Sequence, residues 1–244
     1  MLENHPKDSI LFLDIETVPQ YQNWTDVPEN FQRLWKKKAT SFKDTDEAED
    51  NHYGKAGIYA EFGKIICITV GMFLSKEEKA VFRMKSYASS DEKKLLIEFA
   101  TMLRKFSGES NKTLCAHNGK DFDFPYIARR LLIHGLKIPA MLDNAGKKPW
   151  EIKLLDTMEL WKFGDYKHFT SLDLLTQLFK IPTPKDDIDG SQVAKVFYED
   201  DDLARIVSYC EKDVVAIAQL FLRWKAEPLI DDDQIVVVDT DAKN

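Results

Sequence analysis

Residues 9–16 read Ser-Ile-Leu-Phe-Leu-Asp-Ile-Glu, an apolar run that leads directly into two acidic side chains. The run at 9–14 is typical of a short strand that is buried on both faces of a sheet. Residues two apart on a strand face the same side, so Asp14 and Glu16 should project together from its carboxyl end, the edge where α/β sheets bind ligands. A lone D-x-E is common, however, and the alternative is that Asp14 caps a turn while Glu16 is solvated.

The remaining pattern alternates strands with helices around this first strand. Further strands are predicted at 64–73, 80–87, 113–117 and 153–157. Helices are predicted at about 92–106, 125–134, 171–180, 191–198 and 202–225, from apolar side chains at helical spacing and from their start and stop signals. This order predicts an α/β fold with a central mixed five-stranded sheet, three antiparallel strands followed by two parallel ones, flanked by helices.

Composition indicates a folded chain with an acidic surface. Its 244 residues are 44% hydrophobic, which is enough for a sizeable core and excludes a disordered protein. Lys and Arg number 34 against 41 Asp and Glu, a formal net charge of −7. Coating of duplex nucleic acid is therefore not expected, because that binding depends on neutralising phosphates. An enzyme that grips a few phosphates locally is compatible with this charge.

The chain shows no sign of a secreted or membrane protein. Its three cysteines, Cys67, Cys115 and Cys210, are far apart, which predicts neither a disulfide framework nor a zinc site and suits a reducing cytosol. The start lacks the features of a signal peptide, and no apolar run approaches 18 residues. We therefore expect a cytoplasmic protein with no membrane partner.

The sequence suggests one domain with two additions. A single domain is expected over 1–230, with an insertion at about 19–62 that holds one helix and an acidic stretch at 44–50. An acidic C-terminal tail is expected at 231–244, within which 235–238 is a candidate edge strand.

A second acidic site follows the strand predicted at 113–117. Residues 117–125 read His-Asn-Gly-Lys-Asp-Phe-Asp-Phe-Pro and open a helix. Asp123 would lie at the helix N-terminus, where an acid is also an ordinary cap. Asp121 competes with it for any catalytic role.

A third acid lies in the last long helix. Tyr209 and Asp213 are four residues apart and share one face. Apolar residues on the same stripe indicate that Asp213 points inward, and a buried acid needs a partner or shifts its pKa. Since no Lys or Arg falls clearly on that face, a metal ion is the simplest partner.

Taken together and in this order, the three sites resemble the three exonuclease motifs of the DEDD superfamily, the DnaQ-like 3′-5′ exonucleases with a ribonuclease H-like fold. The resemblance spans about residues 9–225. Tyr209 stands where the tyrosine subgroup has its tyrosine, and Ser208 stands where the other subgroup has histidine. The stretches 163–164, 171–173 and 189–192 resemble a stand-alone group of predicted polymerase-B-like 3′-5′ exonucleases.

The resemblance implies a two-metal hydrolysis of phosphodiester bonds with Mg²⁺ or Mn²⁺. Asp14 would bridge both ions, Glu16 and Asp213 would complete one site, and Asp123 would hold the other through water. Tyr209 would orient the attacking water, since its ordinary pKa near 10 makes it a poor base.

Several further side chains are candidates for substrate contact. Thr17 is a candidate for the 3′-OH, and Asn118 and Phe122 for lining the pocket, although Phe122 could equally pack in the core. Basic pairs and runs at 36–38, 129–130 and 147–148 are candidate phosphate contacts, though such runs are more often solvated faces. His117 fits a hydrogen-bonded structural role better than a catalytic one, and Asp156 would support the site from outside it.

The leading hypothesis is a metal-dependent 3′-5′ exonuclease acting on 3′ ends of single-stranded DNA. An RNA-trimming exoribonuclease is the alternative with the same chemistry. A catalytically inactive nucleic-acid-binding or adaptor module, and an α/β domain whose acids are only caps, are the alternatives from other classes.

Overall fold

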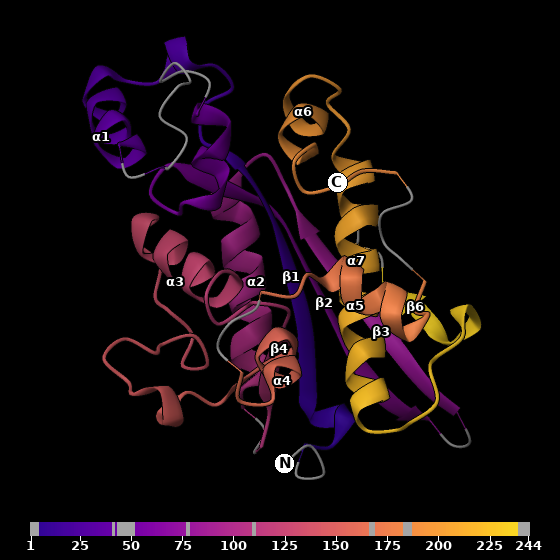
Figure 1. Ribbon diagram of the computed structural model, residues 1–244. Helices are drawn as coiled ribbons and strands as arrows, with labels where there is room; N and C mark the ends of the chain where they lie inside the picture. The colour runs from indigo at the N-terminus through magenta and orange to yellow at the C-terminus, as the bar shows by residue number, and fades with distance from the viewer. Residues whose placement is uncertain are drawn as a thin grey trace.

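The structure is a computed structural model that describes residues 5–40, 42, 52–76, 79–108, 111–165, 169–182 and 187–238. Its centre is a mixed sheet with the strand order β5-β4-β1-β2-β3-β6 (Figure 1). The strands are β1 (Ile10–Pro19), β2 (Gly63–Lys76), β3 (Lys79–Ala88), β4 (Thr113–Ala116), β5 (Leu154–Asp156) and β6 (Ile235–Val237). The first three strands pair antiparallel, and β4 and β5 run parallel to β1, as predicted. The acidic stretch at 44–50 lies outside the described residues.

The sheet has six strands rather than five, because the candidate edge strand at 235–238 is present as β6. It pairs in parallel with Phe82–Met84 of β3 and follows the 3₁₀ turn η6 (Asp232–Gln234). The first part of the predicted acidic tail therefore belongs to the sheet, and residues 239–244 lie outside the described part of the chain. A strand of three residues carries almost no periodic signal, so its partner is set by the open edge of β3 rather than by its own sequence.

Helices cover both faces of the sheet. They are α1 (Glu29–Ala39), α2 (Glu92–Phe106), α3 (Asp123–Ile133), α4 (Thr157–Lys162), α5 (Leu172–Phe179), α6 (Val193–Tyr198) and α7 (Leu203–Trp224). Shorter 3₁₀ turns are η2 (Lys7–Ser9), η3 (Trp24–Asp26), η4 (Tyr53–Ile58) and η5 (Pro149–Glu151). In Figure 1, α2 and α3 lie on one side of β1, and α7 with α5 lies on the other. Among the described residues, no helix combines the length and the apolar character needed to cross a membrane.

The two sides of β1 face two different cores. Leu11, Leu13 and Ile15 pack in the cluster that includes side chains of α2 and α3. Ile10 and Phe12 pack in the cluster that includes side chains of α7. Because side chains of a strand alternate, Asp14 and Glu16 fall on the same side as Ile10 and Phe12, the side of α7.

The insertion after β1 forms its own small aromatic core. The indole of Trp35 on α1 is fully buried, and its ring centroid lies 5.0 Å from that of Phe62 and 5.9 Å from that of Tyr53. Aromatic pairs at such separations add to the stability that burial alone gives. The insertion therefore folds against the end of β1 with a core independent of the sheet.

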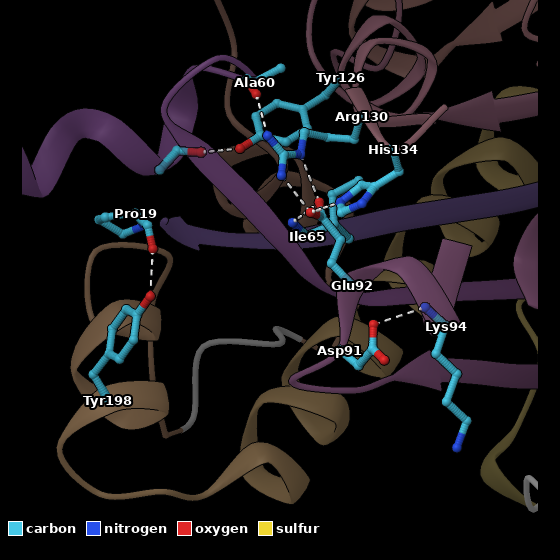
Figure 2. Close-up of polar contacts among 11 residues, drawn as sticks. Pro19, Ala60, Ile65, Asp91, Glu92, Lys94, Tyr126, Arg130, His134 and Tyr198 are labelled. Carbon is cyan, nitrogen blue, oxygen red and sulfur yellow. Dashed lines mark hydrogen bonds and ion pairs between the residues drawn. The ribbon is translucent and has the colours of Figure 1, made fainter. Parts of the chain in front are cut away.

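A buried ion pair fastens α3 to α2 (Figure 2). The carboxylate of Glu92 accepts hydrogen bonds from Arg130 Nε at 2.8 Å and from the backbone N–H of Ile65 at 2.7 Å, and it lies 2.6 Å from His134 Nε2. Arg130 also donates to the carbonyl of Ala60 and is only 3% exposed. Arg130 is thus a structural residue, and its predicted role as a phosphate contact is wrong.

Candidate active site

The first two acids lie just beyond the parallel part of the sheet. The pairing of β1 with β4 ends at Phe12 and Cys115, while β1 continues to pair with β2 through Asp14 and Glu16. The sequence predicted that β1 ends at residue 14, but the strand continues to Pro19. Its pairing with β4 nevertheless ends before the two acids. Asp14 therefore projects beside the end of β4, and a β-bulge follows Glu16.

Helix α7 brings the third motif to the same place. Tyr209 and Asp213 are both buried on its inner face, 8% exposed each. The Tyr209 hydroxyl forms a side-chain hydrogen bond with Asp213. Cys210 Sγ lies 3.4 Å from Asp14 Oδ2, which fixes α7 directly against β1.

Helix α3 brings the fourth acid. Asp123 is the first residue of α3 and is 2% exposed, while the N-cap is Phe122, which makes no side-chain capping bond. The Asp123 carboxylate accepts a hydrogen bond from the backbone of Ile15, the residue between the two acids of β1. Its Oδ1 atom is buried without a hydrogen-bond partner in the described structure. Asp123 is therefore not an ordinary cap, and it belongs to one acidic cluster with Asp14, Glu16 and Asp213.

Burial and mutual repulsion dominate the electrostatics of the acidic cluster. Burial, followed by the charges of Asp213, Asp123 and Glu16, raises the pKa of Asp14 well above its ordinary value. Burial and the charge of Asp213 likewise raise the pKa of Glu16. Burial raises the pKa of Asp123 to about 7. Burial and the neighbouring acids also raise the pKa of Tyr209, so its hydroxyl stays protonated.

The acidic cluster fits divalent cations. Its donors are hard carboxylate oxygens, and the unpartnered Oδ1 of Asp123 is a buried acceptor without a donor. A bound cation would relieve the repulsion that raises these pKa values. Mg²⁺ and Mn²⁺ prefer such oxygen ligands.

Asp156 organises the loop that leads to Asp123. Its carboxylate accepts backbone hydrogen bonds from Asn118 and Lys120 at 3.0 Å each, and from Met158 and Glu159 at the start of α4. Asp156 is 3% exposed. The sequence placed it outside the site as a support, and the structure shows the bonds through which that support acts.

The three predicted substrate contacts lie in different environments. Thr17 follows the bulge, and its side chain hydrogen-bonds Tyr126 of α3. Asn118 has a positive φ of 59°, and its Oδ1 is buried without a hydrogen-bond partner in the described structure. Phe122 is half-buried against the α2–α3 core, with its ring centroid 5.3 Å from that of Tyr126. Core packing thus accounts for Phe122, whereas Asn118 still offers a free acceptor atom.

His117 is structural, as the sequence suggested. Its Nδ1 lies 2.8 Å from Thr157 Oγ1, and its Nε2 lies 2.9 Å from the carbonyl of Thr170. Burial lowers its pKa. The residue that sequence reasoning missed is Cys210, although it lies directly after Tyr209 in the third motif.

Comparison with known families decides the assignment. Residues 58–232 match the model of a family described as predicted 3′-5′ exonucleases related to the exonuclease domain of PolB. The chain belongs to this family. The matched region contains Asp123, Tyr209 and Asp213 and begins after β1, so Asp14 and Glu16 join the site through the fold rather than through the family match.

The fold agrees with that assignment. The structure is similar to that of the family B DNA polymerase from the hyperthermophilic archaeon Pyrobaculum calidifontis, with a TM-score of 0.54 and 16% sequence identity over 90% of this chain. The chain spans only 24% of that polymerase. The likeness confirms the predicted ribonuclease H-like α/β fold, with the sixth strand as the difference.

Proposed function

We propose that this protein is a metal-dependent 3′-5′ exonuclease that removes nucleotides from the 3′ ends of single-stranded DNA. The observation that carries the proposal is the acidic cluster itself. Four carboxylates from β1, α3 and α7 meet at one edge of the sheet in a chain of the PolB-related exonuclease family. Structural caps would have no reason to converge, because like charges at close range destabilise a fold.

Each acid has a distinct position in the proposed site. Asp14 and Glu16 would hold cations from β1, Asp213 from α7, and Asp123 from α3. When bound, two Mg²⁺ or Mn²⁺ ions would activate the attacking water and offset the charge of the leaving 3′ oxygen. The burial of Glu16, Asp123 and Asp213 would keep bulk water away and strengthen their hold on a cation.

Tyr209 would position the attacking water. Its hydroxyl lies beside Asp213, and its raised pKa keeps the proton in place at neutral pH. A hydroxyl that stays protonated can donate a hydrogen bond but cannot act as a general base. Positioning is therefore the role that this environment favours.

An assay with end-labelled oligonucleotides tests the proposal. Single-stranded DNA and RNA of the same sequence, labelled at either end, would be incubated with Mg²⁺, with Mn²⁺ or with EDTA. The expected result is a ladder of shortened products from 5′-labelled DNA, single nucleotides from 3′-labelled DNA, and no hydrolysis in EDTA. Asp14→Asn, purified in parallel, controls for contaminating nucleases.

Each other outcome points to a different function. Faster hydrolysis of RNA would make the protein an RNA-trimming enzyme with the same chemistry. Oligonucleotide binding without hydrolysis in either metal would make it a catalytically inactive binding module. Hydrolysis that persists in EDTA or in Asp14→Asn would contradict the proposed metal site.

A further inference from the structure

A thiol lies inside the acidic cluster. Cys210 Sγ lies 3.4 Å from Asp14 Oδ2 and 3.5 Å from the Asp14 carbonyl oxygen. Asp14, Glu16 and Cys210 each offer one ligand atom, and these three atoms all lie within 4.8 Å of one another. Cys210 is completely buried, whereas Asp14 is only half-buried, so the group is open on the side of Asp14.

The spacing of these atoms suits a cation that accepts sulfur. In a tetrahedral site with metal–sulfur bonds near 2.3 Å and metal–oxygen bonds near 2.1 Å, ligand atoms are about 3.4–3.6 Å apart. The distance of 3.4 Å between Cys210 Sγ and Asp14 Oδ2 already meets this value. The third atom, from Glu16, lies within 4.8 Å of the other two and needs a shift of at most about 1.4 Å, which side-chain rotation can supply.

We propose that Asp14, Glu16 and Cys210 form a binding site for a thiophilic divalent cation of the Zn²⁺ and Cd²⁺ class. Two carboxylates and one thiolate are a ligand set that such ions accept, with water or a further carboxylate in the fourth position. Asp123 is not one of the three grouped ligand atoms, but its Oδ1 is buried without a hydrogen-bond partner in the described structure and its charge acts on Asp14, so this side of the cluster also lacks a cation. Binding replaces the thiol proton of Cys210, which is released to the solvent.

The site discriminates between classes of cation. Mg²⁺ prefers oxygen ligands in octahedral geometry and keeps several waters, so sulfur at Cys210 adds nothing to its binding. A thiophilic ion would bind all three groups and would occupy the carboxylates that the proposed reaction needs. That inhibition rests on the proposed function, whereas the binding itself does not.

Cysteine spacing along the chain could not predict this site. Of the three proposed ligands only Cys210 is a cysteine. Glu16 lies 194 positions before it and Asp14 lies 196 positions before it. Zinc sites are recognised in a sequence by closely spaced cysteines and histidines. These three ligands form no such motif.

Titration with Cd²⁺ alone tests the site without any nucleic acid. The thiolate-to-cadmium charge-transfer absorption in the ultraviolet reports sulfur ligation directly, and calorimetry gives the affinity. Wild-type protein, Cys210→Ala, Cys210→Ser and Cys115→Ala would be compared after their folds are checked by circular dichroism. Cys115 is the matched control, because its thiol is equally buried and lies in β4.

The expected result is one Cd²⁺ bound per chain with a charge-transfer band in wild type and Cys115→Ala. Cys210→Ala and Cys210→Ser should lose the band and bind Cd²⁺ at least about 10–100-fold more weakly, while Mg²⁺ affinity stays unchanged. Because the buried Cys67 thiol hydrogen-bonds Cys210, each Cys210 variant is also made with Cys67→Ala. Absence of the band in wild type, or its persistence in such a double variant, would overturn the proposal. If both Cys210 variants misfold, Asp14→Asn must weaken the wild-type band, and an unchanged band would overturn it too.

The outcome is separable from that of the nuclease assay. A cadmium–thiolate band in a protein that hydrolyses no oligonucleotide would support the thiophilic site and contradict the proposed exonuclease. Hydrolysis with Mg²⁺ by a protein that shows no such band would do the reverse.

Discussion

Asp14, Glu16, Asp123 and Asp213 concentrate negative charge in a small buried volume. The charge of Asp213 raises the pKa of both Asp14 and Glu16, and burial adds to the effect in each case. Without a bound cation, the repulsion between these four carboxylates does not stabilise the fold. The arrangement therefore destabilises the metal-free protein, and binding of the proposed cations would offset this effect.

Removal of charge at Asp14 should abolish hydrolysis without harming the fold. Asp14→Asn keeps the shape of the side chain and removes one of the repelling charges. We expect the rate on labelled DNA to fall by several orders of magnitude, because one of the proposed cation ligands is lost. The melting temperature in EDTA should be unchanged or slightly higher. Asp8→Asn, an exposed acid just before β1, is the matched control, and near-wild-type turnover of Asp14→Asn would refute the assignment.

The second motif contains two acids that the structure separates clearly. Asp123 is buried in the acidic cluster, whereas Asp121, two residues earlier, is exposed. We expect Asp123→Ala to be severe and Asp121→Ala to be mild in a comparison of kcat/KM on the same oligonucleotide. The reverse ranking would show that the register chosen for this motif is wrong.

Tyr209 should matter less than the acids. Tyr209→Phe removes only the hydroxyl that hydrogen-bonds Asp213 and keeps the ring packed on α7. We expect kcat to fall by about 10–10³-fold, the range of positioning and proton-transfer effects, while single-strand binding is spared. An unchanged kcat would remove Tyr209 from the site. A loss as deep as that of Asp14→Asn would give it a role beyond positioning.

At the scale of elements, the site depends on how a loop is held. The segment from Asn118 to Lys120 has no regular structure of its own, and its backbone N–H groups reach the Asp156 carboxylate instead. The same carboxylate caps α4 through Met158 and Glu159. One buried side chain thus sets the path by which the chain enters α3 and reaches Asp123.

Asp156→Ala should therefore be a stability mutation with a catalytic consequence. Loss of the carboxylate leaves several buried N–H groups unpaired, which should lower the free energy of unfolding by about 2–4 kcal/mol. Urea denaturation measures this loss, and kcat/KM should fall because Asp123 loses its fixed approach. Asp156→Asn retains one acceptor oxygen and should lie between wild type and Asp156→Ala. Unaltered stability of Asp156→Ala would contradict the anchoring role.

Most elements could be predicted from the sequence because their signals are local. The side chain of Asp91 accepts a hydrogen bond from the N–H of Lys94 and starts α2 where the acid and the apolar spacing indicated. The partners of Asp156 are 36 and 38 residues away, so they were not readable from local pattern. The apolar run at 235–238 indicated an edge strand, but not that this strand pairs with β3. The motif order predicted which acids converge, whereas the contact of Cys210 with Asp14 required the packing of α7 on β1.

At the scale of the whole molecule, the buried acids make stability depend on pH. Burial raises the pKa of Asp123 to about 7 in the folded protein, against about 3.9 for an unfolded chain. The folded state therefore binds the extra proton between these two values, and this contribution to stability is lost as pH rises through about 7.

Comparison of wild type with Asp123→Asn isolates this contribution. In EDTA, the free energy of unfolding of wild type should fall relative to that of Asp123→Asn between about pH 5 and pH 8. Urea denaturation at the two pH values measures the difference. Excess Mg²⁺ should reduce it, because a bound cation stabilises the ionised carboxylate. Parallel pH profiles in EDTA would show that Asp123 is not buried as a protonated acid.

The contact between Cys210 and Asp14 joins residues 196 positions apart in a sequence of 244. During synthesis, β1 leaves the ribosome well before α7, because β2 to β5 and α1 to α6 lie between them in the chain. Contacts of such separation form late, since the intervening chain must first be ordered. A nascent or partly folded chain therefore carries its acids apart from one another. The proposed nuclease would thereby be inactive until its own folding is complete.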